Sequence, residues 1–131
     1  MLKFLVAIPL IAHGLANLAG VFAPWTKSLQ GFADAPWIFS SGVTYNSWVG
    51  RAFSLLWLAS SLCLVGAGVG VFTHQPWWLL LAILGCAFSA AAILPWWKAV
   101  PPGARFGGIF DLVVLGLLLS PLGAQIAKVI Q

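Results

Sequence analysis

The chain has 131 residues, of which 62% are hydrophobic and 6% are charged. A water-soluble domain of this length could not bury so large an apolar share, so the composition predicts an integral membrane protein. The net charge of +4 comes from Lys and Arg residues scattered along the chain, without the basic stripe that would track a phosphate backbone. Nucleic acid is therefore not an expected partner.

Four apolar runs divide the chain, each about 20 residues long or longer, which is the length of a transmembrane helix. At about 1.5 Å of rise per residue, such a run crosses a hydrocarbon core about 30 Å thick. The sequence therefore predicts an all-α fold, a four-transmembrane-helix bundle in the lipid bilayer, with residues 1–131 as one domain. The helices are expected at residues 3–23, 48–72, 77–97 and 107–127.

The link between the first two helices, residues 24–47, is rich in aromatic residues. Trp and Tyr favour the depth of the lipid headgroups, so we expect this link to lie in the membrane interface. A short helix lying flat from Trp25 to Phe32 is one possibility, and a surface loop anchored by aromatic side chains is the other. The residues expected to line a cavity beneath the link are Trp25, Trp37, Tyr45 and Trp48.

Proline residues mark where the predicted helices begin, bend or end. Pro76 and Pro95 each precede a Trp-Trp pair, which places both ends of the third helix at the headgroup level. Pro9 and Pro121 lie inside the first and fourth apolar runs. Because proline has no backbone N–H, we expect those two helices to bend or end there.

An even number of spans places both termini on one side of the membrane, here called the terminal side. The link at residues 24–47 and the loop between the third and fourth helices lie on the other, the loop side. The positive residues are Lys27, Arg51, Lys98 and Arg105 on the loop side and Lys3 and Lys128 on the terminal side. Because positive loops favour the cytoplasm, we predict that both termini lie outside.

Strongly polar side chains inside a span cost several kcal/mol unless they find a partner, so each is a candidate for function. These residues are His13, Asn17, Arg51 and Asp111. All but His13 lie within about two turns of the loop-side ends of their helices, and His13 lies one turn deeper than Asn17 on the same face. We expect Arg51 to pair with Asp111, and His13 and Asn17 to form the floor of a cavity.

Structural roles are the alternative for three of these residues. Arg51 lies near enough to the membrane boundary to extend its guanidinium into the interface without a partner. Asp111 in the first turn of the fourth helix would interact favourably with the helix dipole, and Asn17 could form an ordinary interhelical hydrogen bond. His13, near the middle of the membrane, is the hardest to explain in this way.

Two cysteines, Cys63 and Cys86, lie equally far from the turn at His74, so an antiparallel helix pair holds them at a similar depth. A disulfide between them is geometrically conceivable. The spacing of thiol redox enzymes is absent, and two free thiols are the expected outcome. Because the Cys and His residues do not have metal-ligand spacing, no metal site is expected.

Three features carry a resemblance to a known group: the segment IAHGLANLAG at residues 11–20, the aromatic link, and the segment GGIFDL at residues 107–112. In length and layout the chain resembles the DoxX-like families of small bacterial four-helix membrane proteins. The resemblance implies a bacterial inner membrane. Some members of that group act with quinones or belong to redox-stress complexes, so it also implies a quinone-adjacent role, but it assigns no catalytic residue to any position here.

Three functions remain open. The first, which we favour, is a non-enzymatic component: an accessory subunit of a larger membrane complex, or a bundle that binds lipid or another hydrophobic ligand. The second is a quinone-linked oxidoreductase or its quinone-binding subunit, in which His13 would bind a quinone carbonyl and Asp111 with Arg51 would supply protons. The third is a small transporter formed by a homo-oligomer, for which prolines inside two helices are suggestive.

Small residues four positions apart predict where helices approach closely. They would serve contacts within the bundle or between copies of the chain, and the first is the commoner case. The residues are Ala12, Ala16 and Gly20, Gly66 and Gly70, and Gly85 and Ser89.

Overall fold

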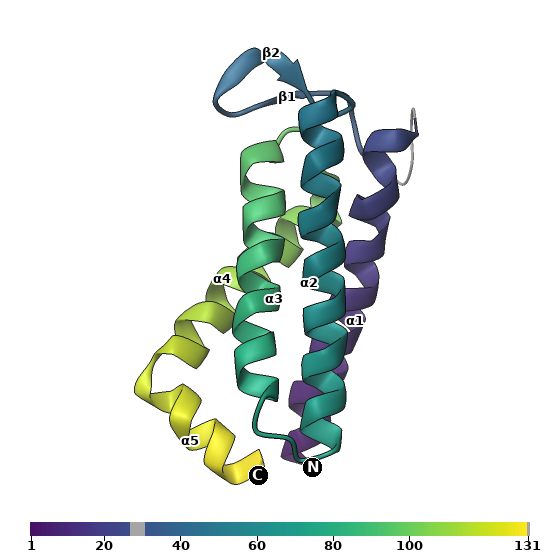
Figure 1. The fold of residues 1–131 in the computed structure, drawn as a ribbon. Coiled ribbons are helices and arrows are strands. Elements are labelled where there is room, and N and C mark those ends of the chain that lie inside the picture. Colours follow the sequence, from purple (N-terminus) through teal and green to yellow (C-terminus); the bar gives the residue numbers. More distant parts are fainter. Residues whose placement is uncertain (27–30, 131) are drawn as a thin grey trace.

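Four long helices form most of the computed structural model, which describes residues 1–26 and 31–130 (Figure 1). Each is apolar and, with its adjoining helical turns, is at least 18 residues long, which is enough to cross a membrane. They confirm the predicted four-transmembrane-helix bundle. The helices are α1 (Leu2–Phe22), α2 (Trp48–Phe72), α3 (Trp78–Ile93) and α4 (Pro102–Leu119).

Consecutive helices are packing neighbours: α1 packs on α2, α2 on α3, and α3 on α4. Helices α1 and α4 are not a main packing pair, so the bundle has a seam between them, here called the α1/α4 seam. Both chain ends lie at one end of the bundle, and the link between α1 and α2 lies at the other (Figure 1). These two ends are the terminal side and the loop side of the sequence prediction.

Glycines allow the helices to approach closely, as their spacing predicts. A Cβ atom at Gly20 of α1 would overlap the ring of Trp57 on α2, and one at Gly85 of α3 would lie 2.7 Å from Leu64 of α2. Larger side chains at these positions would push the helices apart. The predicted small residues at 20 and 85 therefore serve contacts within the bundle.

The fourth predicted helix, residues 107–127, is wrong at both ends, because α4 starts earlier and stops before Ser120. A separate helix, α5 (Pro121–Ile130), follows. The Ser120 backbone is extended, and its hydroxyl accepts a 3.2 Å hydrogen bond from the Leu122 N–H, which caps α5. Pro121 has no N–H with which to continue α4, but it can begin a new helix.

The ends of the first and third predicted helices differ from the structure by a few residues. Short 3₁₀ turns, Ala23–Trp25 and Leu94–Trp96, follow α1 and α3 on the loop side, which is why the predicted helices end later than α1 and α3 do. In contrast to Pro121, Pro9 lies within α1 and does not end it. A proline inside an apolar run therefore does not by itself locate a helix end.

Helix α5 packs back against the terminal side of the bundle. The Nδ1 atom of His74, in the turn between α2 and α3, donates a 2.8 Å hydrogen bond to the carbonyl oxygen of Ile130. The Ile130 side chain is buried beside α2 and α3 in the terminal-side core. His74 has a φ of 54°, in the left-handed region that tight turns use.

The link between α1 and α2 contains a short β-hairpin, which the all-α prediction did not include. Strand β1 (Pro36–Trp37) pairs antiparallel with β2 (Ser40–Thr44). The hairpin is tied to the end of α3, because the Ile38 N–H donates a 2.9 Å hydrogen bond to the Pro95 carbonyl. It lies at the loop-side end of the bundle (Figure 1).

Aromatic side chains join this link to the helices. The ring of Tyr45 is buried, stacks on Phe32 at 5.4 Å and meets the edge of Trp96 at 5.3 Å. Burial raises the pKa of the Tyr45 phenol well above its usual range, so the side chain stays uncharged at neutral pH. The flat helix that was one possibility for residues 25–32 would include residues 27–30, which lie outside the described residues.

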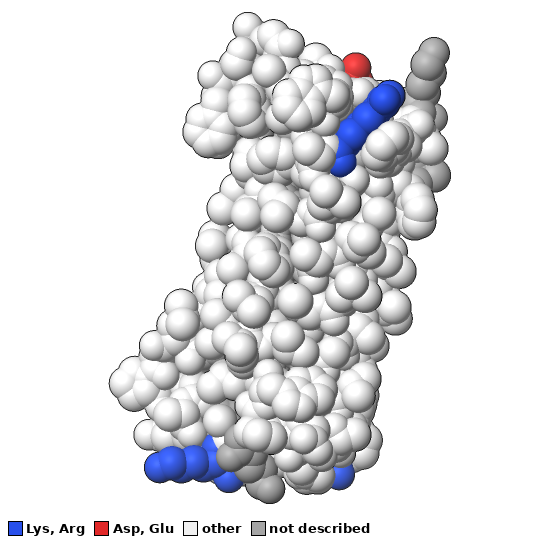
Figure 2. Space-filling model, viewed as in Figure 1, with Lys and Arg blue, Asp and Glu red and all other residues white. Residues whose placement is uncertain are grey.

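Two clusters of buried side chains form the core, one in each half of the bundle. The terminal-side cluster includes Trp78 and Cys86, and the loop-side cluster includes Trp57 and Trp96. Cys63 and Cys86 are free thiols, as expected. Lys and Arg side chains lie at both ends of the face seen in Figure 2, with uncharged side chains between them, as a membrane-spanning bundle requires.

Candidate functional site

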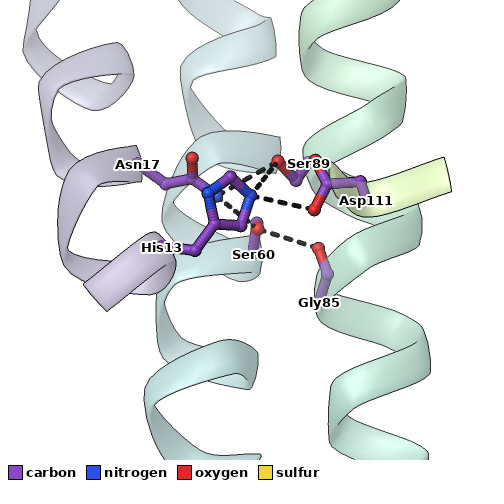
Figure 3. Close-up of polar contacts among 6 residues, drawn as sticks. All are labelled: His13, Asn17, Ser60, Gly85, Ser89 and Asp111. Atoms are coloured by element: carbon purple, nitrogen blue, oxygen red, sulfur yellow. Dashed lines mark hydrogen bonds and ion pairs between the residues drawn. The ribbon is translucent and has the colours of Figure 1, made fainter. Parts of the chain in front are cut away.

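Side chains from all four long helices meet in one polar network inside the bundle (Figure 3). The Nε2 atom of His13 on α1 lies 2.8 Å from Oδ1 of Asp111 on α4 and 3.3 Å from Oγ of Ser89 on α3. The Asp111 side chain is fully buried, and that of His13 is 13% exposed. Through His13, α1 and α4 are joined across the α1/α4 seam although they are not packing neighbours.

Asn17 extends the network to α2. Its Nδ2 atom donates to Ser60 Oγ at 2.8 Å and to Ser89 Oγ at 3.2 Å. Ser60 Oγ in turn donates to the carbonyl oxygen of Gly85 at 2.8 Å. Both amide hydrogens of Asn17 are therefore used, and its carboxamide oxygen points away from the two serines (Figure 3).

Asp111 is the most costly group in this network to bury. Because α4 begins at Pro102, Asp111 lies in the third turn, too far from the helix start for the dipole interaction that was the structural alternative. Its Oδ1 atom faces His13, whereas Oδ2 has no hydrogen-bond partner among the described residues. The thiol of Cys86 also lies close to this carboxyl group. His13 is therefore the partner that makes burial of Asp111 tolerable.

A cavity of about 180 Å³ adjoins the network on the loop side. His13 and Asn17 both line it, as the sequence predicts. Most of the remaining wall consists of small residues of α1 and α4, which leave the space open. These small residues are Ala16, Ala19, Gly103, Ala104 and Gly107.

Gly107 also determines how His13 lies. A Cβ atom at this position would come within 2.8 Å of Cε1 of the His13 ring, so only glycine lets the imidazole lie against α4. The segment at residues 107–112 thus brings a glycine that admits the His13 ring and the carboxyl group that pairs with it.

The aromatic walls of the cavity are Phe32 and Trp57, not the predicted residues. Those predictions were Trp25, Trp37, Tyr45 and Trp48, and none of the four is among the lining residues. Tyr45 lies behind Phe32, and Trp25 and Trp48 are exposed on the outside of the bundle. Position in the link did not reveal which rings face inward.

The predicted pair of Arg51 and Asp111 is wrong. Arg51 is exposed in the first turn of α2, and its guanidinium lies 5.1 Å from the ring of Trp25. Arg51 also lies nine residues, or about 13.5 Å of helix, nearer the loop side than Ser60, the α2 residue that joins the network. Because α4 begins at Pro102, Asp111 lies deeper than the sequence predicts, out of reach of Arg51. Arg51 therefore takes no part in the polar network.

A second cavity, of about 170 Å³, lies along the same α1/α4 seam nearer the terminal side. Its walls are apolar. They include Pro9, Leu10, Trp78, Phe110, Val114 and Ile126. The ring of Phe110 lies 5.1 Å from the ring of His13, so these two side chains stand between the polar and the apolar cavity.

Several residues of the site were not predicted, among them Phe32, the other aromatic wall of the cavity. Ser60 and Ser89 hold the Asn17 amide, and Trp57 forms a cavity wall. Hydroxyl groups are common in transmembrane helices because they can bond to the backbone of their own helix, so they give little signal in a sequence.

A scan against protein-family models finds no match for the chain, and searches of the curated proteins and of the solved structures also find none. The resemblance to DoxX-like proteins therefore stays a prediction from the layout of the sequence. Function has to be inferred from the polar network and the cavities along the α1/α4 seam.

Proposed function

We propose that the protein is a non-enzymatic membrane bundle that binds the polar end of a lipid or other hydrophobic molecule in the loop-side cavity. The observation that carries the proposal is the position of the cavity, directly beside the buried polar network. Ligand pockets commonly combine apolar walls with a few fixed polar groups. Here Phe32 and Trp57 would supply the apolar walls, and His13 and Asn17 would supply the fixed polar groups.

The polar end of the ligand would meet one donor and one acceptor. Asn17 uses both amide hydrogens within the bundle, which leaves its oxygen to accept a hydrogen bond. His13 uses Nε2 toward Asp111, and its Nδ1 atom makes no hydrogen bond to the part of the chain that the structure describes. Because burial disfavours a net charge, we infer that the pair of His13 and Asp111 is neutral overall, in which case Nδ1 carries a hydrogen.

The apolar part of the ligand would lie along the α1/α4 seam. The terminal-side cavity there is lined by apolar side chains and lies beyond His13 and Phe110. The polar groups line the loop-side cavity, and the apolar walls follow them toward the terminal side. A ligand with a small polar head and an apolar tail fits this arrangement.

Filling the cavity tests this proposal without touching the network. In the Ala16→Leu protein, the larger side chain enters the loop-side cavity, and we expect the ligand that co-purifies in mild detergent to fall at least about ten-fold. Ala12→Leu is the matched control, because Ala12 is one turn away on α1, exposed, and not among the lining residues. Native mass spectrometry with lipid extraction measures both.

Two results would count against a ligand-binding bundle. One is equal retention of the bound molecule by the two variants. The other is a wild-type protein that carries no small molecule but co-purifies with other membrane subunits, which would favour the accessory-subunit function instead.

Quinone is a second candidate ligand, supported by the hydrogen-bonded pair of His13 and Asp111 beside the cavity. A quinone carbonyl would accept a hydrogen bond from Nδ1 of His13, with Asp111 fixing the ring. We expect His13→Ala to weaken binding of a short-chain quinone about ten-fold, measured by titration calorimetry. Unchanged quinone affinity in this variant would remove quinone as a candidate, while ligand loss in Ala16→Leu would still support a different lipid.

A further inference from the structure

We propose a second binding site, on the outer face of α2 at the loop side, where Arg51 binds the phosphate group of an anionic membrane phospholipid. The site is separate from the loop-side cavity and shares no lining residue with it. It does not depend on the proposed function, because Arg51 lies outside the polar network.

The guanidinium of Arg51 lies against the Trp25 ring, and Ser54 links that ring to the Arg51 backbone. It lies 5.1 Å from the Trp25 ring, within the range of a cation–π interaction. The Trp25 indole N–H donates to Ser54 Oγ at 3.5 Å, and Ser54 Oγ donates to the Arg51 carbonyl oxygen at 2.6 Å. The ring that supports the guanidinium is thereby tied to the same turn of α2 that carries Arg51.

Within residues 1–26 and 31–130, the guanidinium of Arg51 forms no ion pair with a carboxylate. An arginine that rests on an aromatic face still has the N–H groups at its edge to offer, and these match two phosphate oxygens at once. The charge and the geometry both point to a phosphate group.

An open groove beside Arg51 has the size and depth for a lipid headgroup. It has a volume of about 500 Å³ and is lined by Trp25, Trp48, Arg51, Ala52, Ser54 and Leu55. The two tryptophans are 61% and 78% exposed. Exposed Trp side chains mark the headgroup level, and α2 begins there, at Trp48.

Below the groove, α2 offers an apolar track for an acyl chain. Leu55, Leu58 and Leu62 are exposed and follow Arg51 on one face of the helix, since they lie four, seven and eleven positions after it. Leu62 lies about 16 Å deeper than Arg51, about the hydrocarbon depth of one leaflet. A phospholipid therefore fits the site better than a free phosphate ion does.

Lipid retention by charge-matched variants tests the site. After purification from vesicles of equal parts phosphatidylglycerol and phosphatidylcholine, we expect native mass spectra to show preferential retention of phosphatidylglycerol. In the Arg51→Gln protein the ratio of the two lipids should fall about five-fold. Lys98→Gln is the control, because it removes an equal charge from an exposed position on the same side and should change the ratio less than two-fold.

Two further variants distinguish a specific phosphate site at Arg51 from non-specific attraction of anionic lipid to positive charge. Arg51→Lys keeps the charge but loses the two-pronged geometry, and Trp25→Leu keeps the arginine but loses the supporting ring, so both should fall between the wild type and Arg51→Gln. Added inorganic phosphate should not displace the lipid. Equal loss in Arg51→Gln and Lys98→Gln, or displacement by millimolar phosphate, would overturn the proposal.

Discussion

Replacing Asp111 with alanine should destabilise the bundle by about 3 kcal/mol, because removal of one member of a buried pair leaves the other without a partner. In the wild type, Asp111 Oδ1 lies 2.8 Å from His13 Nε2, and the carboxyl group is fully buried. In the Asp111→Ala protein the imidazole would retain only Ser89 among its partners in the network. Unfolding in mixed detergent micelles of increasing SDS content measures the loss.

A double-mutant cycle separates this pair from the packing of its members. His13→Ala should also be destabilising, but the double variant should lose less than the sum of the two single losses, by about 2 kcal/mol. The reason is that the second substitution removes a group already left without its partner. Additive losses would contradict a direct interaction between His13 and Asp111.

The second large effect is expected at Gly20. A methyl group there would overlap the ring of Trp57, so the Gly20→Ala protein has to separate α1 from α2 or displace the indole. Overpacking of this kind costs about 1–3 kcal/mol. Because Trp57 also lines the loop-side cavity, ligand retention should fall together with stability, as measured by the SDS unfolding and native mass spectrometry assays.

Gly116 provides the control for this substitution. It lies in α4, is exposed, and has no side chain or distant backbone atom within 4 Å of an added Cβ. Gly116→Ala should therefore leave stability unchanged or raise it by about 0.5–1 kcal/mol, since alanine favours a helix more than glycine does. If both glycine variants lost the same stability, close packing at Gly20 would not be the cause.

The transmembrane part of the fold was predictable because it follows from apolar length alone. The ends of α2 match the expected residues 48–72, where the flanking tryptophan and the turn at His74 gave clear signals. The hairpin of β1 and β2 was not predictable, because its two short strands depend on contacts with the end of α3, such as the bond from Ile38 to Pro95. A proline inside an apolar run separates α4 from α5 at Pro121, whereas Pro9 does not interrupt α1.

The meeting of α1 and α4 residues at the site was predictable, but the position of Arg51 was not. His13, Asn17 and Asp111 meet as their shared level in the membrane suggested. Arg51 faces outward on α2 and lies about 13.5 Å of helix nearer the loop side than Ser60, the α2 residue of the network. The early start of α4 and the rotation of each helix about its axis both depend on packing that hydropathy does not encode. Ser60 and Ser89 could not be recognised as site residues, because serine is common in transmembrane helices.

Three predictions remain expectations from the sequence alone. They are the resemblance to DoxX-like proteins, the bacterial inner membrane that it implies, and the location of both termini outside. The four apolar helices support contact with a lipid bilayer.

The central claim is that the loop-side cavity holds the polar end of an apolar ligand. A crystal structure of the protein grown from a lipidic mesophase, with native lipid retained through purification, tests it most directly. We expect elongated non-protein density with its polar end within hydrogen-bond distance of His13 Nδ1 and Asn17 Oδ1, continuing along the α1/α4 seam. A cavity occupied by water alone, with the seam closed by direct packing of α1 on α4, would contradict it.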